Sequence, residues 1–197
     1  MRYEANRSYD RGMEFEKLVA ILLNLLRVRH PEKVRITRHP RVKLYNGTVA
    51  IPDFELVCDL PHQIDHRLIE CQDRHRSSQD IAHKIRDIKS LSRKNRVVLV
   101  YREPEYLSQP VRRALDADGV VCYSLYELAT FLERMGQTLD ALVKRAPSAD
   151  LAGEMAKTIK REVGESGVAK FKASQLSSPK SDEAMLATPP NQNPWRW

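Results

Sequence analysis

The stretch that decides the predicted fold consists of Ile51, Pro52, Asp53, Phe54, Glu55 and Leu56, then a polar interval, then Leu68, Ile69, Glu70, Cys71 and Gln72. Side chains alternate between the two faces of a strand, so Asp53 and Glu55 would share one face of the first strand. Glu70 and Gln72 would likewise share one face of the second. Carboxylates at adjoining strand ends make an oxygen-rich site for a hard divalent cation. The stretch therefore predicts a metal site on two neighbouring strands.

These residues resemble the motif of the PD-(D/E)xK nuclease superfamily, and within it the Mrr-like branch. Pro52 and Asp53 match the first part of the motif, and Glu70, Cys71 and Gln72 stand where the second part would be. An upstream helix containing Phe15 and Glu16 adds to the resemblance, which covers roughly residues 10 to 135. The family usually has Lys where this chain has Gln72, although some active members carry Gln. The resemblance implies an α/β restriction-endonuclease-like three-layer sandwich, with a central mixed β-sheet flanked by helices.

The resemblance also implies roles for individual residues. Asp53 and Glu70 would be metal ligands for Mg²⁺ or Mn²⁺, and the carbonyl of Cys71 would be a third oxygen ligand. Glu16 would assist through a water molecule, or would simply be a solvated residue of an amphipathic helix. Gln72 carries no charge, so its amide would orient water or a phosphate oxygen. A nearby cation such as Lys84 would supply the missing charge.

The periodicity of apolar residues predicts an alternation of strands and helices. The continuous apolar run Val97 to Val100 predicts a strand buried on both faces, and Ser124 with Glu127 predicts a capping box. Asp10 is the expected cap of the first helix, and Asp59–Asp65 is the expected loop between the two motif strands. The predicted helices are 12–29, 77–93, 111–117, 125–135 and 150–164, and the predicted strands are 32–38, 41–45, 48–58, 66–72, 96–101 and 120–123.

Length and composition predict one domain with a C-terminal extension. Among the 197 residues, we expect a nuclease-like domain over 1–146 and a helical, then low-complexity, tail over 147–197. The tail ends in Trp195, Arg196 and Trp197. These residues would dock on a partner protein, on a second copy in a homodimer or on the domain itself, would stack on bases, or would belong to an unstructured terminus.

The chain carries a net charge of +7 and has a pI of about 9.4. A positive field of this size suits a protein that approaches a polyanion such as nucleic acid, although a generically basic surface gives the same value. The predicted helix after the motif would offer a track for phosphate groups, or would merely be a solvated charged face. Its candidate nucleic-acid-binding residues, with those just before and after it, are Arg74, Arg76, Lys84, Lys89, Arg93 and Lys94.

Cysteine and histidine usage argues against disulfides and against a zinc site. Cys58, Cys71 and Cys122 are isolated in apolar runs, which predicts buried free thiols rather than disulfides or a structural zinc site. A zinc site from His62 and His66 would need a helix that Pro61 opposes, so no histidine is assigned as a metal ligand. A single histidine acting as a base stays open, because the ordinary histidine pKa lies near neutrality. The polar first ten residues predict no signal peptide, and the longest apolar run is too short to span a bilayer. We expect a cytoplasmic protein with no membrane contact.

Three functions agree with the sequence. The first is a divalent-metal-dependent nuclease that hydrolyses phosphodiester bonds, with DNA as the expected substrate. The second is a catalytically weak or inactive nucleic-acid-binding module of the same fold. The third is an assembly protein that recruits a partner through its tail.

Overall fold

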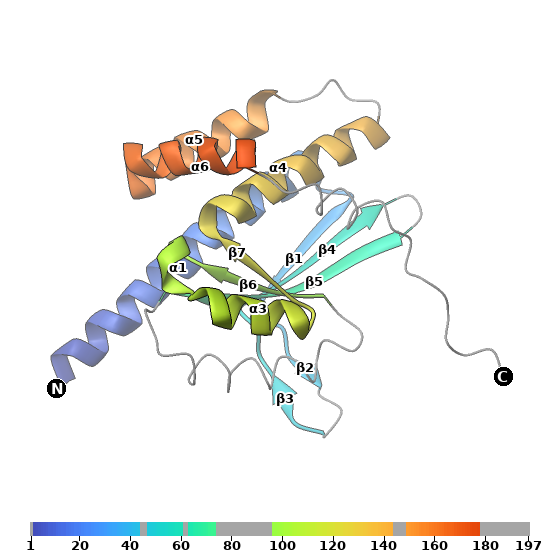
Figure 1. Ribbon diagram of the computed structural model, residues 1–197. Coiled ribbons are helices and arrows are strands. Elements are labelled where there is room, and N and C mark those ends of the chain that lie inside the picture. Colours follow the sequence, from blue (N-terminus) through green and yellow to red (C-terminus); the bar gives the residue numbers. More distant parts are fainter. Residues whose placement is uncertain (1, 44–46, 61–62, 74–95, 144–148, 178–197) are drawn as a thin grey trace.

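The computed structural model describes residues 2–43, 47–60, 63–73, 96–143 and 149–177, with side chains from residue 12 onward. Within these residues, five strands form one mixed sheet in the order β1-β4-β5-β6-β7 (Figure 1). The β1/β4 and β4/β5 pairs are antiparallel, whereas β5/β6 and β6/β7 are parallel. The strands are β1 (Val34–Arg38), β4 (Phe54–Leu60), β5 (Gln63–Gln72), β6 (Arg96–Tyr101) and β7 (Val120–Ser124).

Helices cover both faces of the sheet. Helices α1 (Arg2–Arg29) and α4 (Leu125–Leu142) lie on one face, and α3 (Gln109–Ala117) lies on the other (Figure 1). Alternation along β5 divides the core between these faces: Ile69 packs in the cluster of α1 and α4, and Leu68 packs in the cluster of α3. The molecule is therefore an α/β protein with a mixed central sheet flanked by helices, as the sequence predicted.

Strand β6 confirms the prediction of a central parallel strand. Val97 to Tyr101 are all buried, and β6 lies between two parallel neighbours. After it come the short 3-10 helix η1 (Pro104–Tyr106) and α3.

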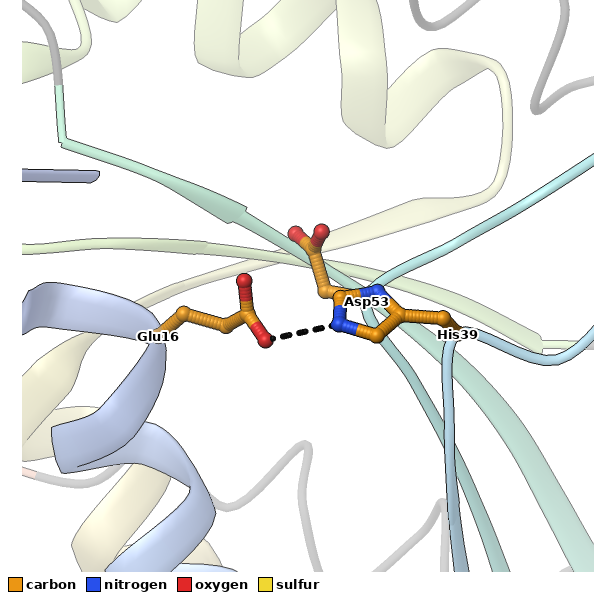
Figure 2. Close-up of side chains that lie close together, drawn as sticks. All are labelled: Glu16, His39 and Asp53. Atoms are coloured by element: carbon orange, nitrogen blue, oxygen red, sulfur yellow. Dashed lines mark ion pairs between the residues drawn. The ribbon is translucent and has the colours of Figure 1, made fainter. Parts of the chain in front are cut away.

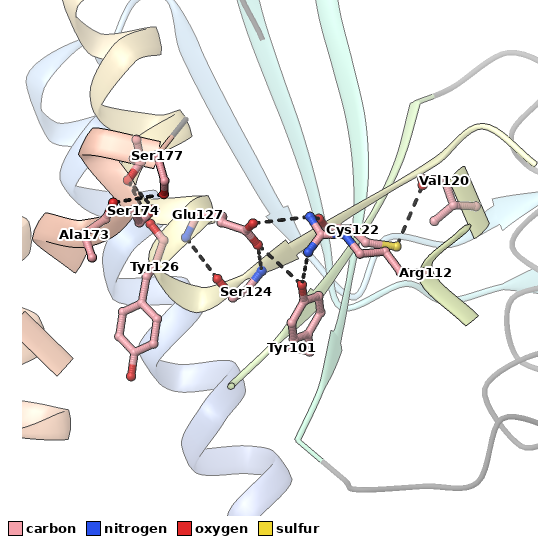
Figure 3. Close-up of polar contacts among 11 residues, drawn as sticks. Tyr101, Arg112, Val120, Cys122, Ser124, Tyr126, Glu127, Ala173, Ser174 and Ser177 are labelled. Atoms are coloured by element: carbon pink, nitrogen blue, oxygen red, sulfur yellow. Dashed lines mark hydrogen bonds and ion pairs between the residues drawn. The ribbon is translucent and has the colours of Figure 1, made fainter. Parts of the chain in front are cut away.

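The capping box is also confirmed. The Ser124 hydroxyl accepts a hydrogen bond from the Glu127 backbone N–H, and the Glu127 carboxylate accepts one from the Ser124 N–H (Figure 3). Glu127 also pairs with Arg112 of α3, whose guanidinium donates to the Tyr101 hydroxyl at 3.0 Å. These contacts connect the ends of β6 and β7 to the starts of two helices.

The strand expected at 48–58 is divided. Its first part is β3 (Val49–Ala50), which pairs with β2 (Val42–Lys43) in a separate two-stranded sheet. Its second part is β4, and Asp53 lies in the bend just before that strand. The strands expected at 32–38, 41–45 and 48–58 therefore do not join in one antiparallel sheet, because the β2–β3 hairpin projects away from the main sheet (Figure 1). Two buried residues, Pro40 and Pro52, flank the base of this hairpin and separate it from β1 and β4.

The loop predicted at Asp59–Asp65 is also too long, because β4 extends to Leu60 and β5 begins at Gln63. Strands β4 and β5 stay paired out to Leu60 opposite Gln63. Asp65, at the end of the expected loop, is buried in β5. Its carboxylate accepts a 2.8 Å hydrogen bond from Arg67, which allows this polar residue to lie inside a strand. The Arg67 guanidinium lies 4.2 Å from the centre of the Phe131 ring on α4, where a cation–π contact compensates part of its desolvation.

Helix α1 begins at Arg2, so Asp10 lies inside the helix rather than capping it. Its early residues include Glu, Ala and Arg, whose good helix propensity extends the helix beyond the apolar stripe. Within the described residues, no helix is long and apolar enough to cross a membrane.

The chain beyond residue 148 forms the expected helix α5 (Ala149–Val163) and a further helix, α6 (Glu165–Ser177), which the sequence analysis did not assign. Leu151, Met155, Ile159 and Phe171 belong to the buried cluster of α1 and α4. Thr130 on α4 also hydrogen-bonds Ser174 on α6 at 2.9 Å. These two helices therefore pack on the α/β core.

Candidate metal centre

One edge of the sheet gathers the candidate functional residues. The last residue of β1, Arg38, pairs with Phe54, the first residue of β4, and Phe54 also pairs with Ile69 near the end of β5. The end of β1, the start of β4 and the end of β5 therefore lie at the same edge. His39 follows β1 and Asp53 precedes β4, so local topology brings these two side chains to that edge.

Glu16, His39 and Asp53 form a group that can hold a metal ion (Figure 2). One potential ligand atom from each residue lies within 4.8 Å of the other two. Glu16 is buried on α1, Asp53 is half-buried, and His39 is exposed. The group thus has one side closed by the protein and one side open to solvent.

The Glu16 carboxylate also has two cationic or polar neighbours. Its Oε1 atom lies 2.8 Å from Nη2 of Arg38 and 3.2 Å from Nε2 of His39. Burial of a carboxylate is costly without such partners. Arg38, at 50% side-chain exposure, faces solvent and can reorient if a cation binds beside Glu16.

The backbone geometry at His39 sets the direction of its side chain. His39 has φ of +47°, in the left-handed region that residues other than glycine seldom adopt. Its N–H donates a 3.0 Å hydrogen bond to the Asp53 carbonyl. This bond closes the base of the β2–β3 hairpin and fixes the two candidate ligands next to each other.

Asp53 is also connected to the second half of the sequence motif. Its Oδ2 atom accepts a 2.7 Å hydrogen bond from the backbone N–H of Cys71. Cys71 lies between Glu70 and Gln72, so this bond fixes the Asp53 carboxylate beside the residues that stand in the second motif position. The contact uses the Cys71 N–H, whereas the sequence analysis assigned a role to its carbonyl.

The structure divides the predicted site residues into three sets. Glu16 and Asp53 belong to the group of three. Glu70 is buried near the end of β5 and Gln72 is partly exposed as its last residue, but within the described part of the chain neither belongs to the group of three. The predicted cationic site residues lie outside the described residues: Lys84, Arg74, Arg76, Lys89, Arg93 and Lys94.

Sequence reasoning missed His39. The sequence predicts no role for His39, which directly follows the strand expected at 32–38. A histidine directly after the first strand of a motif-bearing sheet was the available signal, but its approach to Glu16 depends on the positive φ. That backbone conformation has no signature in the sequence here.

A second set of polar and cation–π contacts, centred on Arg102, lies at the same edge of the sheet. Arg102, directly after β6, donates to both carboxylate oxygens of Asp73, with Nε to Oδ1 at 2.6 Å and Nη2 to Oδ2 at 3.0 Å. The guanidinium also lies 5.1 Å from the centre of the Phe15 ring, next to Glu16 on α1. Burial lowers the pKa of Arg102, but the hydrogen bonds and charge of Asp73 outweigh it and the pKa is raised. This pair fixes the residue that follows Gln72.

The donor set suits a divalent cation. Two carboxylates offer the hard oxygen ligands that Mg²⁺ and Mn²⁺ accept, and an imidazole nitrogen suits first-row transition metals better than Mg²⁺. The three side chains come from separate elements, α1, the end of β1 and the bend before β4, so the fold must form before the site does. The residues fit a metal ion, with Mn²⁺ matching the mixed donor set better than Mg²⁺.

Comparison with known proteins gave no relative: no family model matches the chain, and no curated protein or solved structure matches it. Its class is therefore defined by what the structure contains, an α/β protein whose mixed sheet carries a Glu/His/Asp group at one edge.

Proposed function

We propose that this protein is a divalent-metal-dependent nuclease with a restriction-endonuclease-like fold, which hydrolyses phosphodiester bonds in DNA. The observation that carries the proposal is the convergence of Glu16, His39 and Asp53 at the sheet edge where the motif strands meet. The proposal is strengthened by the hydrogen bond from the Cys71 N–H to Asp53, which joins the two halves of the sequence motif.

Each residue has a defined task in this proposal. A divalent ion, when bound, supplies an activated water molecule and neutralises charge on the phosphate group. Glu16 and Asp53 provide the negative charge that holds the ion, and His39 adds a neutral nitrogen ligand. The Cys71 N–H keeps the Asp53 carboxylate oriented, so little reorganisation is needed when substrate arrives.

Gln72 makes slow turnover the expected behaviour. Its amide can donate a hydrogen bond to a phosphate oxygen or accept one from water, but it brings no positive charge. A missing point charge beside the reacting phosphate corresponds to a loss of a few kcal/mol in transition-state stabilisation, where each 1.36 kcal/mol is a factor of ten in rate.

The alternative is a nucleic-acid-binding module of the same fold without catalysis. Two observations favour it: Gln72 replaces the usual Lys, and the Glu16 carboxylate is already paired with Arg38 and His39. The net charge of +7 supports both proposals, because each requires attraction to a polyanion. The third function, partner recruitment through Trp195–Trp197, rests on a tail outside the described residues.

The test is cleavage of a substrate panel in the presence of Mg²⁺ or Mn²⁺. The panel contains linear, supercoiled, branched and single-stranded DNA, together with RNA, so that it also identifies the substrate class. Variants Glu16→Gln, His39→Asn, Asp53→Ala and Glu70→Ala are compared with Glu154→Gln, which changes an exposed acid on α5.

We expect Glu16→Gln and Asp53→Ala to abolish cleavage and His39→Asn to weaken it, while Glu154→Gln leaves it unchanged. Glu70→Ala tests the second motif position, which lies outside the group of three. Activity that survives Asp53→Ala would contradict the proposal. Tight, salt-sensitive binding of nucleic acid without metal-dependent cleavage by the unaltered protein would establish the binding module instead.

A further inference from the structure

The β2–β3 hairpin rises directly from the candidate metal centre. His39 and Asp53 stand at the two ends of the segment that forms it, and the His39 N–H to Asp53 carbonyl bond closes its base. Val42 pairs with Ala50, and both pack against the buried cluster that contains Leu68. The hairpin is therefore anchored at its base and along one face.

The opposite face of this ribbon is exposed. Residues directly across an antiparallel pair share a face, and successive pairs alternate. Because Val42 and Ala50 face the core, the neighbouring pair, Lys43 with Val49, faces solvent. Arg41 and Ile51 directly flank the two strands, where the same register would place them opposite each other. All four are exposed, with Val49 at 47% and Ile51 at 56%. We call these four residues the ribbon face.

Charge indicates the partner of the ribbon face. It carries two cations, Arg38 adds a third at its base, and the sequence from residue 38 to residue 52 contains no Asp or Glu. A symmetric dimer through this face would set the same cations against one another, which opposes a second copy as the occupant. A polyanion, by contrast, matches both cations at once.

The shape of the two-stranded ribbon favours a double-stranded nucleic acid among the possible polyanions. The major groove of B-form DNA, about 12 Å wide, admits a two-stranded β-ribbon. Cationic side chains on such a ribbon reach phosphate groups, and apolar side chains such as Val and Ile contact thymine methyl groups at the floor of the groove. The combination of two cations and two β-branched apolar residues on one face fits this mode.

We propose that the ribbon face is a groove-binding arm for double-stranded DNA, which holds the duplex beside the Glu16/His39/Asp53 group. The role of the arm in positioning a substrate rests on the proposed nuclease function, whereas its binding of duplex DNA does not. Arg41 lies two residues from His39, and Ile51 two residues from Asp53, a span of about 7 Å of extended chain in each case. A duplex seated on the ribbon therefore has its backbone next to the candidate metal centre.

The experiment measures binding of a labelled duplex by fluorescence anisotropy, without divalent metal and at increasing salt concentration. Arg41→Gln/Lys43→Gln is compared with Lys157→Gln/Lys172→Gln, which removes two exposed cations from α5 and α6. We expect the ribbon variant to bind roughly 10- to 30-fold more weakly and its salt slope to fall by about 2. The α5/α6 variant should match the unaltered protein. Equal losses in the two variants, or no loss in the ribbon variant, would overturn the proposal.

A second variant tests the apolar half of the face. Val49→Thr/Ile51→Thr keeps β-branched side chains, so the ribbon should form and the melting temperature should hardly change. We expect weaker duplex binding with an unchanged salt slope. Sedimentation of the same variant checks for a protein partner: loss of a dimer with unaltered duplex affinity would assign the face to self-association and overturn the inference.

Cleavage assays separate this inference from the proposed function. If the unaltered protein binds duplex through the ribbon face but never cleaves with Mn²⁺, the nuclease proposal fails and the groove-binding arm stands. If it cleaves and the ribbon variant cleaves with the same apparent affinity, the arm fails and the nuclease stands.

Discussion

The Asp53 carboxylate and the Cys71 backbone N–H are joined by a 2.7 Å hydrogen bond that connects the bend before β4 to the end of β5. Asp53 and Cys71 are 18 residues apart in the chain, so the bond depends on the antiparallel pairing of the two strands. The same carboxylate belongs to the group that Asp53 forms with Glu16 and His39. A single residue thus connects the motif strands to the candidate metal ligands.

Two substitutions of Asp53 separate its structural role from its metal-binding role. Asp53→Asn keeps an oxygen that can accept from Cys71 but removes the charge, so we expect Mn²⁺ affinity to fall at least tenfold with stability almost unchanged. Asp53→Ala also loses the hydrogen bond, which costs about 1 kcal/mol of unfolding free energy. Calorimetric titration with Mn²⁺ and urea denaturation measure the two effects. Mn²⁺ binding by Asp53→Asn as tight as that of the unaltered protein would show that the carboxylate is not a ligand.

The positive φ of His39 predicts that an Asn substitution at this position is better tolerated than a Val substitution. Asn enters the left-handed region readily, so His39→Asn should fold normally while losing the preference for Mn²⁺ over Mg²⁺ that an imidazole ligand gives. His39→Val places a β-branched side chain in that region and should lower stability by about 1 to 3 kcal/mol. Thermal denaturation and metal titration of both variants check this. Equal stability of the Asn and Val variants would argue against the backbone conformation described.

The sequence predicted the features that depend on local pattern. The apolar run of β6 and the Ser124–Glu127 capping box are written in neighbouring residues and were found as expected. The full extent of β5 was not predictable in this way, because Asp65 looks like a loop residue until Arg67, which lies against the Phe131 ring of α4, pairs with it. Long-range pairing of this kind overrides local propensity.

The same difference between local patterns and long-range contacts applies to the residues of the candidate site. Asp53 and Glu16 were candidates because the family resemblance marks both positions. His39 was not, because its approach to Glu16 requires a left-handed residue and a closed hairpin base. Neither feature has a residue-type signal in the segment from Arg38 to Pro40.

The Arg102–Asp73 pair predicts a stability effect at the end of β5. Asp73 has only 4% of its side chain exposed, so Arg102→Met leaves a nearly buried carboxylate without its bidentate partner and should cost about 2 to 3 kcal/mol. Arg102→Lys keeps the charge but loses the paired geometry, and should cost less. The double variant Arg102→Met/Asp73→Asn should recover part of the loss in urea denaturation. Additive losses in the double variant would mean that the two side chains are not energetically coupled.

Two buried thiols predict a decline of stability in alkaline solution. Burial raises the pKa of Cys58 to about 12, with a further contribution from Asp65, and raises that of Cys122 to about 12, with a further contribution from Asp116. Above the ordinary thiol pKa of 9.0, the unfolded chain releases these protons while the folded chain retains them. Each thiol therefore lowers the free energy of unfolding by about 1.4 kcal/mol per pH unit as the pH rises from 9 toward 12.

Comparison with Cys58→Ala and Cys122→Ala isolates this effect from other titrating groups. Each variant loses packing at every pH, but its stability should decline less steeply than that of the unaltered protein by about 1.4 kcal/mol per pH unit above pH 9. Urea denaturation at several alkaline pH values gives these slopes. Identical slopes in all three proteins would show that the thiols ionise as easily in the folded chain as in the unfolded one.

Alanine substitutions at two helical glycines test whether α5 packs on the α/β core. A Cβ at Gly136 on α4 would lie 2.5 Å from Cδ2 of Leu151 on α5 and 3.4 Å from Cδ1 of Leu26 on α1, whereas a Cβ at Gly153 on α5 would meet no atom within 4 Å. Replacing glycine by alanine in a helix adds up to about 1 kcal/mol of stability where there is room. We therefore expect Gly153→Ala to raise the unfolding free energy. Gly136→Ala should lower it by about 1 kcal/mol, because Leu151 is 2% exposed and overpacking outweighs propensity. Urea denaturation gives both signs, and stabilisation by both variants would mean that α5 is not held against α1 and α4 in solution.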